Sequence, residues 1–485
     1  MPLHNVTDPI GMAPPIFYIG DPLRPAHRSI CPMPNTDSSR TRAILNALGP
    51  GLIMAGAAIG VSHLVQSTRA GAEYGFIAAV LIVAACLFKY PFLEYGPRYA
   101  AATGESLLDG YRRLGSWATG AFGLITVGTM FIVLAGVTAV TAGLVGWLAG
   151  TTPNLTLWSG VVLGLCILIL MVGRYQLLDR FMKVIMALLA VSTVIAAGAA
   201  LTGPAPAMVE EAAGPSALLT TSGIAFSLAL MGWMPVPIDV SAWHSLWTLE
   251  RERDTGTRLA LRDVQADFAI GYALSLLMAL AFLVLGSALM YGTGTEFGSG
   301  AVAFATQVVD LYTTTLGTWA GTLVGIAALT TMLSTTLAVT DAYGRLVAWF
   351  TAYLQGTPLA ARSLARAPEA VAAGSATTSG SQSASSSTSE GDDIGALQRY
   401  YRLGLFITPV GAWAILALLV QSLTALVDVA TTLAFLAGPV LGAMNYYLVC
   451  SDHMPEHAQP STGMRALSWA GLVFLVAFCV AYVVV

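Results

Sequence analysis

Charged residues are scarce in this sequence of 485 residues. Asp, Glu, Lys and Arg together make up 10% of it, whereas hydrophobic residues make up 56%. A soluble domain carries roughly 25% charged residues, so this composition predicts a polytopic membrane protein in a lipid bilayer. The formal net charge is -4 and no basic face is evident, so we expect no nucleic-acid partner.

Paired cysteines and an apolar signal-peptide core are also missing. The five cysteines are scattered, mostly within apolar runs, with no CxxC or Cys/His spacing. We expect these cysteines to pack as small apolar side chains and not to form disulfides or a zinc site. Without a signal-peptide core or another targeting segment, a bacterial-type plasma membrane is the expected location. No cofactor is expected.

Long apolar runs recur along the chain. They cover roughly residues 49–72, 76–97, 117–149, 155–173, 181–202, 217–247, 265–291, 313–340, 402–420, 424–449 and 465–485. Each is long enough to cross a membrane as a helix. We therefore predict an all-α integral membrane protein of about eleven transmembrane helices, whose termini lie on opposite sides.

Polar segments divide these runs. Residues 1–47 are predicted to be a disordered cytoplasmic tail. Helices 1–8 fall within residues 48–350 and helices 9–11 within 399–485, separated by a low-complexity cytoplasmic linker over residues 355–398. If residue 1 is cytoplasmic, the inner segments hold 20 of the 22 Lys and Arg residues. The positive-inside rule then places the N-terminus in the cytoplasm and the C-terminus outside.

The first apolar run has a polar centre. It reads GPGLIMAGAAIGVSHLVQSTRAGAEYGF from Gly49 to Phe76, with Gly60 and His63 in the middle. Such a centre is tolerated at membrane depth only where it is buried in protein or lines a watery cavity. The pattern predicts a broken helix at a transport site.

A second run, over residues 224–247, is interrupted as well. Gly232, Pro235 and Pro237 lie in its middle, and two prolines this close should break a helix. Pro237 can be the first residue of the second half-helix, with Asp239 in its first turn. The two breaks are five spans apart, as expected for two inverted repeats of five helices plus an eleventh helix.

These features resemble the Nramp family of divalent metal transporters. The resemblance rests on the GPG before the first run, on AGAEYGF over residues 70–76, on Met234-Pro235 and on the eleven-span layout. It covers roughly residues 45–485 apart from the linker. It implies a LeuT-like fold with helices 1 and 6 broken, and a secondary transporter that works by alternating access as a proton symporter.

The sequence departs from the family at the metal site. The family's Asp-Pro-Gly-Asn corresponds here to the residues from Gly60 to His63, so both metal-binding side chains of that motif differ. The family's Met-Pro-His corresponds to Met234-Pro235-Val236, which keeps the methionine but not the histidine. Residues 117–150 contain no ionisable side chain, although the family's third helix carries acidic residues for proton transfer.

A cation site between the two breaks would need other ligands. An imidazole, a hydroxyl, a thioether, a carboxylate and the carbonyls of the unwound segments are available. The predicted substrate-binding residues are Gly60, Ser62, His63, Met231, Met234 and Asp239. Of these, His63, Met234 and Asp239 would hold a metal ion, and His63 or Asp239 could carry a proton.

Structural alternatives remain open for these residues. Asp239 could cap a half-helix, His63 could make a structural hydrogen bond, and Met234 could pack. Lys89 is expected to snorkel or to pair with neighbours near the end of its span. Arg69 is expected to form an i,i+4 rim or gate contact with Glu73.

Three functional classes can be compared on these residues. The first is a secondary transporter of a small cation, of the Nramp type. The alternative is a transporter of the same fold for a small organic solute, whose carboxylate could bind a helix N-terminus. An intramembrane hydrolase using Ser62 with His63 or His244 is disfavoured, because adjacent Ser and His point in different directions. We therefore predict a transporter and not an enzyme.

Overall fold

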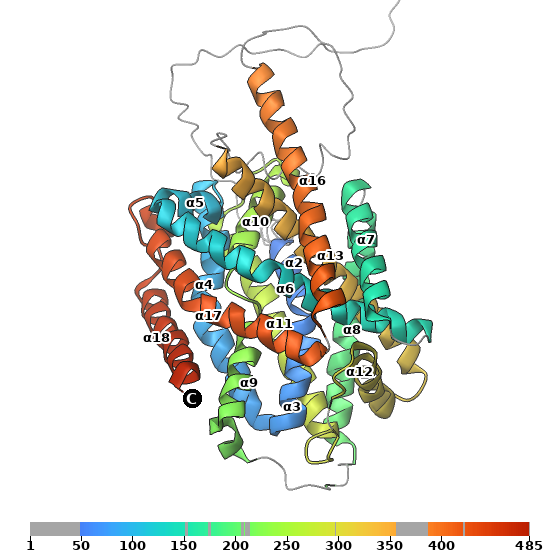
Figure 1. Cartoon of the computed structure of the whole chain (residues 1–485). Coiled ribbons are helices and arrows are strands. Elements are labelled where there is room, and N and C mark those ends of the chain that lie inside the picture. Colours follow the sequence, from blue (N-terminus) through green and yellow to red (C-terminus); the bar gives the residue numbers. More distant parts are fainter. Residues whose placement is uncertain are drawn as a thin grey trace, which may run out of the picture. The chain divides into compact units, whose positions relative to one another are not determined.

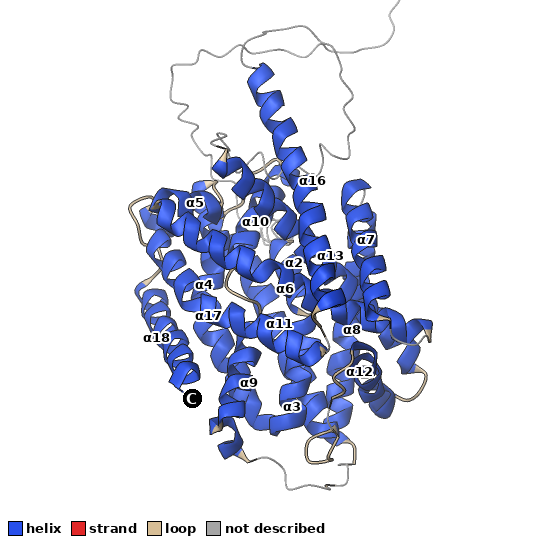
Figure 2. Ribbon diagram, in the orientation of Figure 1, coloured by secondary structure: helices blue, strands red, loops and turns tan. Residues whose placement is uncertain are grey.

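Every regular element in the described part of the chain is helical (Figures 1 and 2). The computed structural model describes residues 49–150, 154–172, 176–204, 208, 214–295, 297–355, 387–420 and 422–484. The predicted tail, residues 1–47, lies outside this part, as does most of the predicted linker, residues 355–398.

The chain passes back and forth as a bundle of transmembrane helices. Helix 1 consists of α2 (Pro50–Ala58), η1 (Ser62–Ser67) and α3 (Thr68–Tyr74), and helix 6 of α9 (Thr221–Gly232) and α10 (Val240–Thr255). The remaining passes are α4 (Ala78–Thr103), α6 (Ser116–Ala149), α7 (Leu155–Val172), α8 (Gln176–Thr202), α11 (Leu261–Leu289), α13 (Ala320–Leu354), α16 (Ser387–Leu418), α17 (Leu423–Val449) and α18 (Thr462–Val484).

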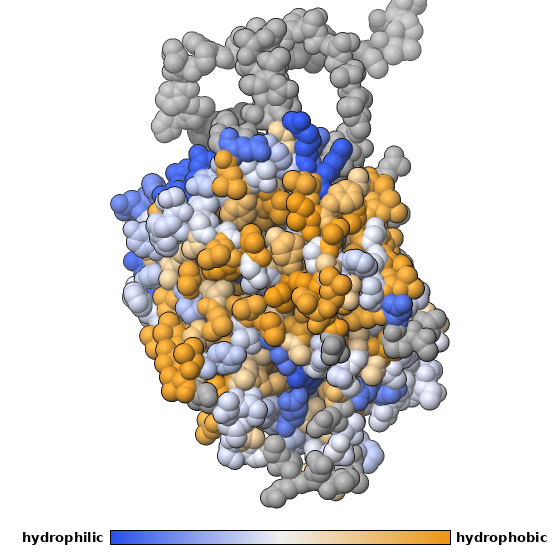
Figure 3. All heavy atoms as spheres, in the orientation of Figure 1, coloured by the Kyte–Doolittle hydropathy of each residue, from blue (hydrophilic) through white to orange (hydrophobic). Residues whose placement is uncertain are grey.

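The surface of this bundle is apolar where lipid would surround it. Nine helical stretches of the described part are long and apolar enough to cross a membrane. Large apolar side chains are exposed on several helices, including Leu124, Val184 and Val473. Figure 3 shows a broad apolar zone across the middle of one face, with hydrophilic residues gathered at its upper end. The predicted all-helical, multi-pass membrane fold is confirmed.

Three segments differ from the sequence-based prediction. The predicted eighth span, 313–340, is divided between α12 (Ala301–Leu316) and α13, because the chain turns at Gly317 with a φ of 93°. A short helix α5 (Leu107–Leu114) was not predicted, although Ser106 and Asp109 form its capping box. The predicted linker ends earlier than residue 398, because α16 begins at Ser387.

Helix 1 is held in place along α11. A Cβ at Gly51 would come within 2.2 Å of the Asp267 carbonyl oxygen, and one at Gly71 within 2.1 Å of the Leu283 carbonyl oxygen. Small residues allow this close approach of two helix backbones. The Asp267 carboxylate also accepts backbone N–H groups at the start of α2, at 3.1 and 2.6 Å. Helix 1 is therefore held against α11 on both sides of its centre.

Candidate functional site

The predicted break in helix 1 is confirmed. The α-helix α2 ends at Ala58, and the chain continues as the π-helix η1 from Ser62. Single turns of π-helix are frequent at functional sites. Gly60 packs against Thr335 of α13, where a Cβ would lie 2.9 Å from the threonine side chain. Gly60 therefore leaves no room for a side chain unless Thr335 moves.

His63 is fully buried and bonded on both sides of its ring. Nε2 lies 2.8 Å from the carbonyl oxygen of Ser275 in α11, and since a carbonyl only accepts, Nε2 carries a proton. Nδ1 lies 2.9 Å from the hydroxyl of Ser62, which also lies 2.6 Å from the carbonyl of Ala58. These bonds tie the break in helix 1 to α11.

The predicted break in helix 6 is also confirmed, but its second half begins later than predicted. The half-helix α9 ends at Gly232, and α10 begins at Val240, not at Pro237. Asp239 occupies the N-cap position, yet its side chain makes no capping hydrogen bond. Neither proline can donate a backbone N–H, so several carbonyls of this segment lack helical partners.

Lys89 fills this break from the neighbouring helix α4. Its ammonium donates to the carbonyl oxygens of Met231, Gly232 and Val236 at 3.1, 2.9 and 2.7 Å. The residue is 2% exposed. Of the two predicted alternatives for Lys89, snorkelling and pairing with neighbours, the structure shows the second, because the carbonyls of the break offer three acceptors within reach. The ammonium also interacts electrostatically with Asp239.

A cavity of about 40 Å³ lies between the two breaks. This is room for roughly three water molecules. Ser62 and Thr335 contribute the only hydroxyl groups among its lining side chains, and two tryptophans contribute indole rings. The lining residues are Ala57, Val61, Ser62, Val133, Val137, Trp233, Val236, Pro237, Val240, Trp243, Thr335 and Val339. The indole N–H groups of Trp233 and Trp243 find no partner among the described residues.

The predicted site residues are only partly brought together. Ser62 lines the cavity, Gly60 lies beside it against Thr335, and Met231 contributes its carbonyl to Lys89. The Met234 sulfur accepts from the hydroxyl of Ser67 at 3.8 Å. In the part of the chain that the structure describes, no three His, Cys, Asp or Glu side chains are grouped to hold a metal ion.

Sequence reasoning missed three residues of this region and did not recognise the position of a fourth, Lys89, at the break. Thr335, Trp233 and Trp243 give no signal in a single sequence, because threonine and tryptophan are ordinary residues of apolar helices. Lys89 did give a signal, since an ionisable residue inside a membrane span is by default a candidate functional residue.

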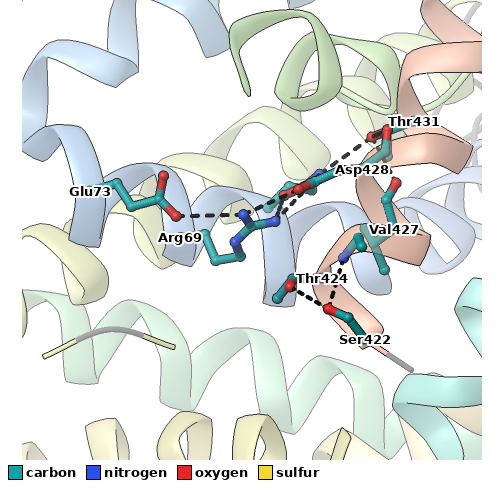
Figure 4. A network of polar contacts seen from close by, with 9 residues as sticks. Arg69, Glu73, Ser422, Thr424, Val427, Asp428 and Thr431 are labelled. Carbon is teal, nitrogen blue, oxygen red and sulfur yellow. Dashed lines mark hydrogen bonds and ion pairs between the residues drawn. The ribbon is translucent and has the colours of Figure 1, made fainter. Parts of the chain in front are cut away.

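A network of charged residues lies farther along helix 1 (Figure 4). Arg69 pairs with Asp428 of α17 at 2.7 Å and, as predicted, with Glu73 at 3.5 Å. The guanidinium also donates to Gln66 at 3.0 Å and lies 5.2 Å from the ring centroid of Phe226 in α9. The network thus connects helix 1, helix 6 and α17 at one end of the site.

Comparisons with known structures show the fold. The chain is similar to a manganese transporter of Eremococcus coleocola, at 14% identity and a TM-score of 0.62, over 93% of this chain and 88% of that one. It is also similar to MhsT in complex with L-phenylalanine, at 14% identity and a TM-score of 0.52, over 92% and 98% of the two chains. These likenesses confirm the predicted LeuT-like fold with broken helices 1 and 6.

Comparisons of sequence give the family. An uncharacterized protein of Pasteurella multocida (strain Pm70) is 37% identical over 304 residues, which are 62% of this chain and 69% of that protein. Residues 51–485 match the family described as natural resistance-associated macrophage protein-like, or Nramp. The chain therefore belongs to the Nramp family and is a secondary transporter of that type.

Proposed function

We propose that this transporter carries a small organic solute that presents hydrogen-bond acceptors, and that the solute binds in the cavity between the two breaks. The observation that carries the proposal is a mostly apolar cavity lined by Trp233 and Trp243, whose buried indole N–H groups have no partner among the described residues. A buried donor left unpaired costs roughly 1–3 kcal/mol. A ligand with a carboxylate, carbonyl or imide oxygen would remove that cost.

The fold supports this cargo class. MhsT has L-phenylalanine bound, and the similar transporter Mhp1, at 15% identity and a TM-score of 0.50 over 90% and 91% of the two chains, has bromovinylhydantoin bound. Both ligands combine an apolar body with acceptor oxygens. Small-molecule sites are usually apolar with few oriented polar groups, which describes this lining. The cavity would have to widen as helices 1 and 6 move apart in alternating access.

A metal cation is the second candidate cargo. Family membership and the likeness to a manganese transporter favour it. The predicted ligands His63, Met234 and Asp239, with the Ser62 hydroxyl and the carbonyls of Gly60 and Met231, would have to form the site. His63 is already bonded to α11, and the Met231 carbonyl to Lys89. A cation would therefore retain much of its water shell or require these bonds to break.

A proton is the proposed coupling ion, and His63 its carrier. The Ser62 hydroxyl has one hydrogen but lies within reach of two acceptors, Nδ1 of His63 and the carbonyl of Ala58. When Nδ1 is protonated it donates to Ser62, and the hydroxyl can then donate to Ala58. Loss of that proton would rotate a hydroxyl that lines the cavity.

We place the protein in the plasma membrane with its N-terminus in the cytoplasm.

Binding to the purified full-length protein tests the proposal. A panel of small carboxylates and amides, with L-phenylalanine as first probe, is titrated against the parent and against Trp233→Phe and Trp243→Phe. Each variant keeps a ring and removes one N–H. We expect affinity to fall about tenfold per lost bond, which is 1.4 kcal/mol. Trp319→Phe is the matched control, because Trp319 is 69% exposed.

The same assay separates the two cargo classes. Saturable Mn²⁺ binding that is lost in Met234→Ala, without binding of any organic probe, would overturn the proposal and establish the cation. Equal affinity of parent and both indole variants for a bound organic probe would also overturn it.

A further inference from the structure

The carbonyl group of Met231, with those of Gly232 and Val236, forms an oxygen cluster at membrane depth. At the end of α9 the Met231 carbonyl accepts the N–H of Met234 at 3.3 Å in a turn and keeps a lone pair for another donor, and the negative end of the helix dipole lies there. Pro235 and Pro237 remove two further donors from the segment. Three convergent carbonyl oxygens in an apolar surrounding make a site for a small cation.

Lys89 occupies that site with all the bonds an ammonium can make. Its three N–H donors match three acceptors at 3.1, 2.9 and 2.7 Å, and no solvent reaches the group in quantity, since the residue is 2% exposed. A buried charge is tolerated only when it is paired and hydrogen-bonded, and here the carbonyls and Asp239 meet that need. The arrangement is too complete to be incidental packing.

The lysine also comes from outside the broken helix. Lys89 belongs to α4, whereas its acceptors lie in the last turn of α9 and within the gap that precedes α10. Gly232 packs against the Thr431 carbonyl of α17, where a Cβ would lie 1.9 Å away, so one end of the gap is fixed. The ammonium therefore bridges two segments in the way that a bound ion would.

We propose that Lys89 is a tethered cation, which permanently occupies a monovalent-cation site formed by the carbonyls of Met231, Gly232 and Val236. This ammonium group holds the break in helix 6 together, so no dissolved ion is needed there. When the lysine side chain is removed by mutation, the empty site would bind a soluble ammonium-like cation. The inference does not depend on the cargo and goes beyond the proposed function.

Chemical rescue of Lys89→Ala tests the assignment. The full-length variant in detergent micelles is heated with and without methylammonium chloride, and unfolding is followed by tryptophan fluorescence. Removal of one partner of a buried charged cluster should lower Tm by roughly 10 °C. Methylammonium fits the vacated space and should restore at least half of that loss, whereas the parent should not respond.

Two controls make the rescue specific. Tetramethylammonium supplies the same charge without N–H donors, and it should not rescue. Lys89→Met fills the volume without a charge, so it should be destabilised and insensitive to methylammonium. A Lys89→Ala protein as stable as the parent would overturn the proposal. So would a Tm that methylammonium raises no more than tetramethylammonium does.

A second measurement covers the case in which Lys89→Ala does not fold. The sequence contains only two lysines, Lys89 and Lys183, so Lys183→Arg leaves Lys89 as the single lysine. This protein is treated with acetic anhydride when folded and when denatured, and acetylation is measured by mass spectrometry. If the Lys89 ammonium is bound to the three carbonyls, its acetylation should be at least tenfold lower in the folded protein than in the denatured protein. Equal acetylation in both states would refute the tethered cation.

Discussion

Helices 1 and 6 break at equivalent points of the fold, yet their breaks are closed by different chemistry. Helix 1 continues through a π-helical turn, and its polar side chains bond to nearby carbonyls of helix 1 and α11. Helix 6 leaves a gap from residue 233 to residue 239, and the free carbonyls there bond to a lysine from α4. The helix 1 break is closed by its own polar side chains, which bond to helix 1 and α11, whereas the helix 6 break is closed by a charge from another helix.

The break in helix 1 can therefore rearrange more readily than the break in helix 6. The hydroxyl of Ser62 can turn between two acceptors, and Gly60 faces only a threonine side chain. Gly232, by contrast, lies against the backbone of α17, and its own carbonyl is bonded to Lys89. We infer that the helix 1 break responds to cargo and protons, while the helix 6 break acts as its rigid counterpart.

The largest expected effect is a loss of stability when the glycine at a break is replaced by alanine, which adds one methyl group. In Gly232→Ala the new Cβ would lie 1.9 Å from the Thr431 carbonyl oxygen, and a backbone cannot yield locally. We expect a loss of about 3 kcal/mol of stability or more. In Gly60→Ala the Cβ would lie 2.9 Å from the Thr335 side chain, which can shift more readily than a backbone although its hydroxyl bonds to Gly56, so the loss should be smaller, about 1 kcal/mol.

Thermal unfolding of the two variants measures this contrast. Gly128→Ala is the control, because no atom lies within 4 Å of a Cβ at that helical position. Equal losses in Gly232→Ala and Gly60→Ala would show that the two breaks are equally rigid, and the comparison would fail.

The next effect concerns the histidine that ties helix 1 to α11. His63→Ala removes two hydrogen bonds from a fully buried position and leaves a cavity, so stability should fall by about 2 kcal/mol. If His63 also carries the coupling proton, uptake by proteoliposomes should lose its pH dependence. Ser62→Ala removes one of these two bonds together with the contact from the Ser62 hydroxyl to the Ala58 carbonyl, but it leaves a much smaller cavity, so it should cost about half as much. A His63→Ala protein with unchanged Tm and pH profile would rule out both roles.

The breaks themselves could be predicted from the sequence, but the side chains that close them could not. Gly60 within a polar centre and two prolines near Gly232 mark the gaps, because these residues weaken a helix locally. Lys89 lies far from residue 232 in the chain, and no periodicity says which neighbour a long side chain will reach. The capping role of Asp267 at α2 was missed for the same reason, since that contact joins residues 216 positions apart.

The cavity was even less predictable. Its lining depends on which faces of helix 1, helix 6, α6 and α13 turn inward, and uniformly apolar helices carry no amphipathic signal that fixes their rotation. The six predicted site residues lie at the breaks or carry groups that can bind a cation, whereas tryptophan and valine side chains gave no such reason for a prediction. Only Ser62 of the six lines the cavity, which shows that position along a broken helix does not determine which side chains face the site.

A smaller effect is expected where helix 1 meets α17. Arg69 bonds to Asp428 through its guanidinium, whereas helix 6 meets the same helix through Gly232 without any charge. A double-mutant cycle with Arg69→Gln and Asp428→Asn should give a coupling of about 1 kcal/mol, since Asp428 is partly exposed. High salt should weaken that coupling but leave Gly232→Ala unaffected. Salt-independent coupling would contradict a charge contact.

The smallest effect is expected for Glu73, the other partner of Arg69. Its carboxylate lies 3.5 Å from the guanidinium and its side chain is 43% exposed, so water screens the pair. Glu73→Gln should change stability by less than about 0.5 kcal/mol. A matched comparison with Asp428→Asn decides which carboxylate holds the second half of helix 1. If Glu73→Gln costs more than Asp428→Asn, the helix is anchored within itself, and the link to α17 is not what distinguishes helix 1 from helix 6.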